Sequence, residues 1–489
     1  MGTPRRAIPY VVFSLLPFFP GCQQIVGIGD TTVGGPDGGA GVTAPMCGDG
    51  EVEGSEQCDG NLLQGSTCQT EGYDLGVLSC NPDTCTLDDS QCADLPDMNR
   101  PALATGNKHT CALLDGGAVR CWGAGGSGRL GQGDTTTIGD DELPSSVEVV
   151  SVGGTAVALT AGAHTCALLE QGGVRCWGPG TNGLLGLGST ENIGDDELPS
   201  SVGLVDIGGS GTVALSAGSL HSCALSSTGS VRCWGLGAQG QLGHGNTETI
   251  GDDETPRTVG SVQVGGTVIA VTVGSSHTCA LLVTGAVRCW GFAGKGRLGY
   301  GNGTSIGDDE LPSVAGDIDL GGTAVAVSAG NEHTCALLDT GAVRCWGNGD
   351  SGVLGYGDTK AIGDTEVPGS AGDVPIGGTA VAVAAGSFHT CALLDTGAVR
   401  CWGRNDSGQL GYGHTVNIGD NELPSSAGDV DLGGIAVALD AGEQHTCALL
   451  NTGAVRCWGR GQEGQLGHGD TSAIGDDEPP SSAGNVPFQ

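Results

Sequence analysis

The feature that most constrains the fold of this sequence is a unit that is written seven times from residue 103 to the C-terminus. Each unit contains HTCALL, AVRCWG, GQLGHG and IGDDE or close variants of them. A fixed period of this kind indicates a repeat architecture, in which each unit buries its apolar surface against its neighbours. The first cysteine of each unit recurs every 55 to 57 residues: Cys111, Cys166, Cys223, Cys279, Cys335, Cys391 and Cys447.

Each unit predicts four short strands, which is the content of one β-propeller blade. In the fifth unit these strands are residues 317–320, 323–328, 333–338 and 342–347. Both sides of the strands carry Ala, Val, Leu or Cys, as expected when neighbouring sheets cover both faces. We therefore expect an all-β fold, a seven-bladed β-propeller, in which residues 486–488 join the blade begun by residues 101–105.

Composition limits the partners of such a chain. The 489 residues include 18 Lys and Arg against 55 Asp and Glu, a formal net charge of −37. This charge argues against binding to nucleic acid or to an anionic membrane through bulk electrostatics, and it favours a cationic partner. The 95 glycines also argue against long helices, because each interior glycine costs about 1 kcal/mol relative to alanine.

The third and fourth predicted strands of each unit form a hairpin whose register can be counted. In the fifth unit the turn 339–341 pairs Leu338 with Ala342, which places Cys335 directly opposite Cys345. Opposed Cβ atoms lie about 4.5–5.5 Å apart, which approaches disulfide range. Buried free thiols are the alternative. We expect one disulfide in each unit: Cys111–Cys121, Cys166–Cys176, Cys223–Cys233, Cys279–Cys289, Cys335–Cys345, Cys391–Cys401 and Cys447–Cys457.

Residues 1–22 have the pattern of an export signal. Arg5 and Arg6 precede an apolar stretch, residues 8–19, that is too short to span a bilayer as a helix. The stretch leads to FPGC, which resembles a bacterial lipobox and predicts that Cys22 is lipidated. We expect an exported lipoprotein of the outer membrane or cell surface, attached to the membrane only through that lipid. Ordinary cleavage, which gives a periplasmic or secreted protein, is the alternative.

A cysteine-rich module lies between the export signal and the repeats. Residues 23–46 are rich in glycine and predict a flexible linker, and residues 93–102 form a second linker. Residues 47–92 have little apolar material for a core, so disulfides must stabilise them, and the sequence does not choose among the possible pairings. The opening CGDGEVEGSEQCDG resembles a cysteine-rich repeat of bacterial surface proteins. The module contains Cys47, Cys58, Cys68, Cys80, Cys85 and Cys92.

Three further residue types recur once in every unit. A tryptophan follows the second cysteine, where it indicates packing between blades: Trp122, Trp177, Trp234, Trp290, Trp346, Trp402 and Trp458. An arginine precedes the second cysteine and is expected to pair with acidic neighbours: Arg120, Arg175, Arg232, Arg288, Arg344, Arg400 and Arg456.

A histidine stands two residues before the first cysteine of each unit. Equivalent residues on packed sheets are about 10 Å apart, which is too far for a shared metal ion, so we expect a structural role at a strand edge. These histidines are His109, His164, His221, His277, His333, His389 and His445.

The motif IGDDE, with the variants IGDTE and IGDNE, predicts an acidic ring on one face of the propeller. Such a ring would bind divalent cations or a basic protein, and a set of solvated turns that keep the surface soluble is the alternative. The motif holds 19 of the 55 acids: Asp140, Asp141, Glu142, Asp195, Asp196, Glu197, Asp252, Asp253, Glu254, Asp308, Asp309, Glu310, Asp364, Glu366, Asp420, Glu422, Asp476, Asp477 and Glu478.

The repeats argue against catalysis. A catalytic set is a unique constellation of nucleophile, base and orienting group, whereas nearly every polar residue here exists in seven copies. The units differ at loop positions, such as Gly349-Asp350 against Asn405-Asp406, and these positions would carry binding specificity. We expect a monomer that is not an enzyme and that has no cofactor or resident metal.

The segments GNEHTCALLDTGAVRCWG and GQLGYG resemble the repeat of the regulator of chromosome condensation family over residues 103–489. The resemblance implies a seven-bladed propeller but little about activity, because the founder is a nuclear guanine-nucleotide exchange factor while secreted bacterial relatives serve as binding surfaces. We expect a non-enzymatic binding or scaffold protein that recognises a protein or glycan through its propeller loops. The alternative is a secreted modulator, such as a hydrolase inhibitor or an exchange-factor-like regulator.

Overall fold

The computed structural model describes residues 57–58, 63, 75–76, 79–81, 86–88, 92–93, 102–208 and 211–489. The chain contains two compact units, residues 16–93 and a larger unit that includes residues 94–489. The export signal, Cys22 and the linker 23–46 lie outside the described residues.

The described part of the small unit consists of two short antiparallel pairs. They are β1 (Leu75–Gly76) with β4 (Cys92–Ala93), and β2 (Ser79–Asn81) with β3 (Thr86–Asp88). Cys58 is fully buried and forms a disulfide with Cys80, with an S–S distance of 2.04 Å. The side chains of the other four cysteines of this module lie outside the described residues.

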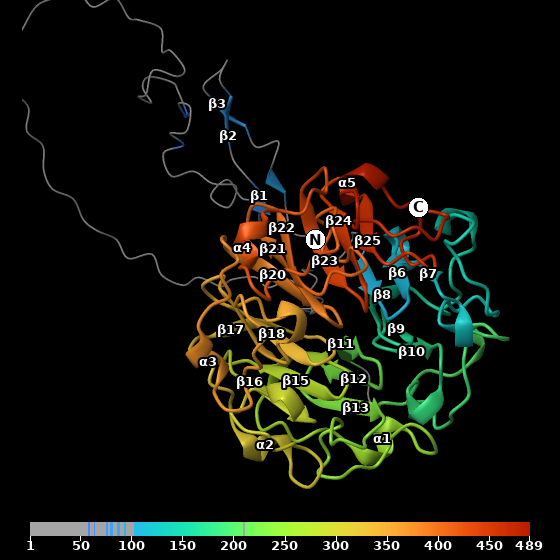
Figure 1. The fold of residues 1–489 in the computed structure, drawn as a ribbon. Coiled ribbons are helices and arrows are strands. Elements are labelled where there is room, and N and C mark those ends of the chain that lie inside the picture. The colour runs from blue at the N-terminus through green and yellow to red at the C-terminus, as the bar shows by residue number, and fades with distance from the viewer. Residues whose placement is uncertain are drawn as a thin grey trace, which may run out of the picture. The chain divides into compact units, whose positions relative to one another are not determined.

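The large unit is a ring of seven three-stranded antiparallel sheets, in which the last sheet lies beside the first (Figure 1). We number the sheets in chain order. They are β5–β7 (Ala102–Thr105, His109–Leu113, Val119–Gly123), β8–β10 (Ala156–Ala161, Thr165–Leu169, Val174–Trp177), β11–β13 (Thr212–Ala217, His221–Ser226, Val231–Gly235), β14–β16 (Val268–Val273, His277–Leu282, Val287–Gly291), β17–β19 (Ala324–Ala329, His333–Leu338, Val343–Gly347), β20–β22 (Ala380–Ala385, His389–Leu394, Val399–Gly403) and β23–β25 (Ala436–Ala441, His445–Leu450, Val455–Gly459).

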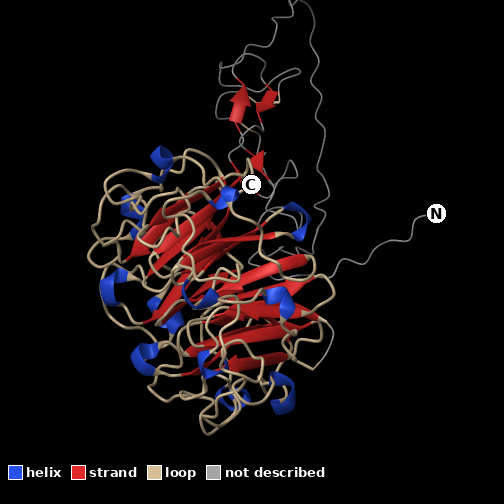
Figure 2. Cartoon of the chain, turned by 90° about the vertical axis from the view of Figure 1, so that its right-hand side faces the viewer, coloured by secondary structure: helices blue, strands red, loops and turns tan. Residues whose placement is uncertain are grey.

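The helices are short and lie around the strands (Figure 2). In α2, Pro312 supplies a fixed φ at the first position, and Gly316 ends the helix with a φ of 77°. The α-helices are α1 (Pro256–Val259), α2 (Pro312–Ala315), α3 (Pro368–Ala371), α4 (Pro424–Ala427) and α5 (Pro480–Ala483). The 3-10 turns are η1 (Asp115–Gly117), η2 (Gly126–Gly128), η3 (Pro144–Ser146), η4 (Thr181–Gly183), η5 (Pro199–Ser201), η6 (Gly294–Gly296) and η7 (Asp350–Gly352). Among the described residues, we find no helix with the length and apolar character needed to cross a membrane.

The hairpin between the second and third strands of each sheet has the predicted register. In the fifth sheet Cys335 pairs with Cys345 and Leu337 with Val343. The turn is possible because Gly341 has a φ of 78°, a conformation that residues with a Cβ rarely adopt. All six residues of β18 are buried, as expected for a strand covered by neighbouring sheets on both sides.

The prediction that residues 317–320 open the fifth sheet is wrong. The Ile318 N–H donates to the Val287 carbonyl at 2.9 Å, and Val287 belongs to the outermost strand of the fourth sheet. The segment therefore extends the preceding sheet before Gly321, with a φ of 63°, turns the chain toward the next one. Each sheet therefore has three strands, and a short segment at its outer edge is attached by a backbone hydrogen bond.

The prediction that residues 486–488 join the first sheet is wrong for the same reason, because this segment also extends the sheet that precedes it. The Val486 N–H donates to the Val455 carbonyl at 2.8 Å, so this segment extends the last sheet rather than joining the first. It still reaches the first sheet, because the Phe488 ring lies 6.0 Å from that of Trp122 and the Ser145 N–H bonds to the Pro487 carbonyl. Packing rather than strand pairing closes the outside of the ring here.

The first strands of the seven sheets line a central channel with a volume of about 320 Å³. Its walls are mainly aliphatic and include Val157, Leu215, Ile269, Val325 and Val381. Between the sheets, all seven repeat tryptophans are completely buried. The core of this unit is therefore a series of layers between sheets, and each layer uses the same residues.

Candidate functional site: the loop face of the propeller

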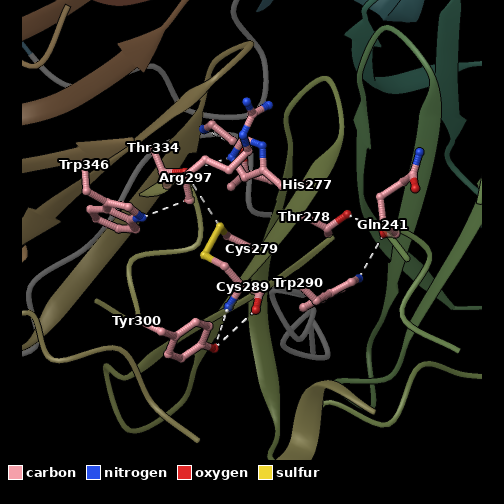
Figure 3. Close-up of a disulfide and its surroundings, with 12 residues drawn as sticks. Gln241, His277, Thr278, Cys279, Cys289, Trp290, Arg297, Tyr300, Thr334 and Trp346 are labelled. Atoms are coloured by element: carbon pink, nitrogen blue, oxygen red, sulfur yellow. Dashed lines mark hydrogen bonds between the residues drawn. A yellow bond between two sulfur atoms is a disulfide. The ribbon is translucent and has the colours of Figure 1, made fainter. Parts of the chain in front are cut away.

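Each loop that leaves the third strand of a sheet is held in place by the next sheet. Around the fourth sheet, the carbonyl of Arg297 accepts hydrogen bonds from the Trp346 indole at 3.0 Å and the Thr334 hydroxyl at 3.3 Å (Figure 3). The carbonyl of Gln241 is held in the same way by Trp290 and Thr278, at 3.0 and 2.8 Å. Six of the seven tryptophans fix a loop backbone in this way in addition to packing between sheets, whereas the Trp402 indole N–H has no hydrogen-bond partner in the described part of the chain.

The repeat histidines form a ring of hydrogen bonds that joins every sheet to the next. Nε2 of each histidine lies 2.7–2.9 Å from a Thr or Ser hydroxyl of the following sheet, and the last bond returns to the first sheet. The pairs are His109–Thr165, His164–Ser222, His221–Thr278, His277–Thr334, His333–Thr390, His389–Thr446 and His445–Thr110.

This network defines the protonation state of the histidines. All six threonine hydroxyls donate to loop carbonyls, as Thr110 does to Gln465 at 2.9 Å, so they accept from Nε2–H. Burial lowers the pKa of His221 and His389 to about 3, and further lowering comes from His164 and His333 respectively. The histidines are neutral and have a structural role. Six of them begin a middle strand and His164 directly precedes one, and each bonds to the following sheet.

A second ring of bonds lies along the channel. The side-chain oxygen near the end of one inner strand accepts the backbone N–H of the next inner strand in five sheets. These bonds are Thr160 to Ala217, Ser216 to Val273, Thr272 to Ala329, Ser328 to Ala385 and Asp440 to Thr105, at 2.7–3.1 Å. Burial raises the pKa of Asp440, which is the one carboxylate at these positions, while its bonds to the Thr105 N–H and the Ala441 N–H oppose that rise.

At the end of the sheets where the histidines lie, each sheet carries two residues that are adjacent in space and have the same backbone arrangement in every sheet. The first residue directly precedes the ring histidine, and the second directly follows the glycine that ends the outer strand. The N–H of the second bonds to the carbonyl of the first at 2.9 Å in six sheets, whereas Pro179 has no N–H to donate. We call these seven pairs the display pairs: Lys108/Ala124, Ala163/Pro179, Leu220/Leu236, Ser276/Phe292, Glu332/Asn348, Phe388/Arg404 and Gln444/Arg460.

The display pairs differ in character around the ring, and we call the end that carries them the loop face. Sheets 2 to 4 present Pro179, Leu220, Leu236 and Phe292, which form an apolar sector. Sheets 6, 7 and 1 present Arg404, Arg460 and Lys108, which form a cationic sector. The identical backbone frame with different side chains is the arrangement expected of a binding surface on a rigid scaffold.

The acidic motifs lie at the same end of the sheets as the display pairs. Ile138 bridges to Gly123, the residue directly before display residue Ala124, and six further sheets repeat this bridge. In five motifs three carboxylates come within 4.8 Å of one another, whereas Thr365 and Asn421 interrupt the other two. Partial burial and hydrogen bonding to Asp477 raise the pKa of Glu478 to about 7. The predicted acidic residues therefore surround the outer part of the loop face.

The recurrent arginines only partly follow the expectation that they pair with acids. Three of them do so: Arg288 with Asp317, Arg344 with Asp373 and Arg400 with Asp429, at 2.6–2.9 Å. The other four bind backbone carbonyls of the outer segments, as Arg120 does with Phe488 and Arg456 with Ser481. Arginine is suited to this role because its guanidinium has five N–H donors, and several carbonyls of the outer segments have no hydrogen-bond partner on a neighbouring strand.

Sequence reasoning found the cysteines, the tryptophans and the acidic motifs but missed two sets of residues. One set is the Thr and Ser residues that bond to the histidines, and the other is the side-chain oxygens of the ring along the channel. Both sets recur in the repeat, and this recurrence is a signal that could have identified them. Their role was not visible, because each one acts on a different unit of the chain.

Seven repeated sheets around one channel, with variable residues on one face, define a repeat β-propeller. The chain belongs to the RCC1-like domain family: that family model matches residues 194–487, and the model of the regulator of chromosome condensation (RCC1) repeat matches residues 102–129. The family predicted from the repeat motifs is confirmed.

Known relatives cover the repeats to different extents. The chain is 30% identical over 373 residues to the ultraviolet-B receptor UVR8 of Arabidopsis thaliana, covering 76% of this chain and 79% of UVR8. It is 32% identical over 361 residues to the E3 ubiquitin-protein ligase HERC2 of Homo sapiens, covering 73% of this chain but only 7% of HERC2.

Solved structures show the same fold. Yeast RCC1 (Prp20), in its crystal structure with Kap60, matches with a TM-score of 0.59 and 19% identity, covering 78% of this chain and 85% of that one. Human WBSCR16 matches with a TM-score of 0.59 and 22% identity, covering 73% of this chain and 88% of that one.

Proposed function

We propose that this chain is a non-enzymatic binding protein that captures a partner protein on the loop face of its propeller. The observation that carries the proposal is the set of display pairs. The same backbone arrangement, hydrogen-bonded in six of the seven sheets, carries a different pair of side chains in each sheet. Relatives of the same fold support it, since yeast RCC1 is described bound to Kap60, and its binding to Gsp1p and histones has been characterised.

The acidic motifs favour a partner with a basic surface. They place 19 carboxyl groups at the end of the sheets that carries the display pairs, in a chain of net charge −37. A field of this sign accelerates the approach of a cationic partner and weakens as salt is added.

We place this activity outside the cytoplasm. The export pattern of residues 1–22 and the cysteine at position 22 support a lipid-anchored protein, and the cysteine pairs of the sheets fit an oxidising compartment. Labelling with radioactive palmitate tests the anchor: incorporation into the full chain and its loss in Cys22→Ala support it, whereas an unlabelled chain contradicts it.

A comparison of two variants tests the binding proposal. The first replaces four residues of the loop face by serine: Phe292→Ser, Phe388→Ser, Arg404→Ser and Arg460→Ser. The matched control replaces four residues at the hairpin turns, on the opposite end of the sheets: Val283→Ser, Asp339→Ser, Asp395→Ser and Asn451→Ser. Proteins retained from native envelope extract by the oxidised full chain are quantified by mass spectrometry. Loss of the retained partner in the first variant alone supports the proposal, and equal capture by both contradicts it.

A further inference from the structure

We propose that the centre of the loop face binds an extended segment of the partner that is acidic at one end and apolar at the other. The acidic end contacts Arg460 in the cationic sector, and the apolar end packs on Leu220, Leu236 and Phe292. This inference rests on the proposed function and specifies what the partner must present to the surface.

Arg460 is the residue that points to a carboxylate ligand. Its Nη1 and Nη2 groups donate to Oε1 of Gln444 and Oε1 of Gln462, at 2.8 and 2.6 Å, and its Nε is buried without a hydrogen-bond partner. Among the described residues, no carboxylate lies within ion-pairing distance of this guanidinium. A half-buried cation with only neutral partners is costly, and a carboxylate that accepts the remaining Nη–H donors would compensate it.

The neighbours of Arg460 differ from it in having acidic partners within the chain. In the sixth sheet Arg404 donates through Nε to Asp406 at 2.8 Å and lies over the Phe388 ring at 5.6 Å. In the first sheet Lys108 pairs with Glu463 at 3.3 Å. Both charges are therefore compensated within the chain, whereas Arg460 provides a charge that is free to take a ligand.

The apolar sector lies across the channel from Arg460. In a ring of seven, the seventh sheet stands opposite the third and fourth sheets, which present Leu220, Leu236 and Phe292. Phe292 is 38% exposed, and its ring is fixed by Arg297, whose guanidinium carbon lies 5.0 Å from the ring centroid. A segment that contacts both sectors must therefore cross the mouth of the channel in an extended conformation.

The acidic motifs restrict which acidic segment can approach. They surround the outer loop face with carboxylates, so a partner that is acidic throughout would be repelled. The fitting partner has its carboxylates confined to a short stretch and carries basic residues around it. The acidic stretch of such a partner would face the cationic sector, and its surrounding basic residues would face the acidic motifs.

Selection from a library of random dodecapeptides on phage tests the proposal, with the oxidised full chain as bait. We expect the selected peptides to combine Asp or Glu at one end with aromatic or aliphatic residues at the other. A synthetic winner should bind Arg460→Gln about tenfold more weakly, as expected for loss of a charged bidentate contact. Arg460→Lys should recover part of the affinity, and the exposed Lys360→Gln should change nothing.

Three results would overturn the proposal. They are winners without acidic residues, binding that is unaffected by Arg460→Gln, and enrichment no greater than on an unrelated disulfide-bonded protein. Denaturant unfolding of Arg460→Gln verifies that a loss of binding does not reflect a loss of fold. The proposed function fails separately, when the serine variants of the two ends retain the same proteins from the envelope extract.

Discussion

The backbone N–H of Thr105 donates a hydrogen bond to Oδ2 of Asp440 at 2.7 Å, across 335 residues of sequence. This bond joins the inner strand of the first sheet to that of the last. Equivalent bonds in other sheets use Thr or Ser hydroxyls, so the sheet that closes the ring is the one in which a carboxylate replaces a hydroxyl. Asp440 also accepts the N–H of Ala441 at 3.1 Å.

We expect Asp440→Ala to lower the free energy of unfolding by about 1–3 kcal/mol, because it leaves a buried N–H without a partner. Asp440→Ser should recover most of this loss, since serine performs the same role at position 328. Urea unfolding under oxidising conditions measures both. Asp339→Ala, an exposed acid on a hairpin turn, is the control, and an equal loss in that variant would contradict the assigned role of Asp440.

The histidine ring predicts that acid destabilises the propeller. The ordinary histidine pKa is 6.5, and burial lowers that of His164 and His445 to about 3 in the folded chain. Between these values the unfolded chain binds more protons, so the stabilising contribution is complete above pH 6.5 and is lost as the pH falls toward 3. Each buried histidine should cost about 1.4 kcal/mol per pH unit in this window.

Urea unfolding at a series of pH values from about 8 to 5 measures this slope. His333→Gln should reduce it, because glutamine donates to Thr390 without titrating in this range. Thr471→Gln, at an exposed loop position, is the control and should leave the slope unchanged. Glu478 has the opposite effect on the free energy of unfolding. Its pKa in the folded chain is about 7, above the ordinary 4.5, so protonation between these values favours the folded chain. A stability that rises on acidification would show that such glutamates outweigh the histidines.

Two glycines separate backbone strain from packing between sheets. Gly355 and Gly372 have φ values of 82° and 77°, so alanine is strained at both positions. A Cβ on Gly355 would lie 2.6 Å from Val374 and 2.8 Å from the Trp402 indole nitrogen, whereas a Cβ on Gly372 meets nothing within 4 Å. Gly372→Ala should cost about 1 kcal/mol and Gly355→Ala clearly more. Calorimetric melting temperatures compare them, and equal losses would mean that the Trp402 contact can relax.

The cysteine pairs should stabilise each sheet independently. Cys335 and Cys345 are joined across one hairpin and lie ten positions apart in the sequence. Removing the bridge with Cys335→Ala and Cys345→Ala should lower the free energy of unfolding by about 2–3 kcal/mol in the chain-entropy model. Peptide mapping of the oxidised full chain provides the companion measurement. Links between different sheets, or free thiols at these positions, would contradict the assigned pairing.

Local features of this protein could be read from its sequence. The hairpin register that opposes Cys335 and Cys345 follows from a three-residue turn and simple counting, because the partners are ten residues apart. The ring of repeated sheets follows from the period, since a unit with apolar residues on both faces must pack against its copies. The acidic motifs and the variable loop positions were also visible as patterns.

Only the tertiary structure decided which unit each residue acts upon. Residues 317–320 bond to the sheet before the one they were assigned to, His277 bonds to Thr334 of the sheet after it, and Asp440 bonds to Thr105 at the other end of the repeats. The physical reason is that equivalent residues in identical units have the same local preferences. Their period shows that they are equivalent, whereas the direction of each contact between units depends on how the sheets pack in space.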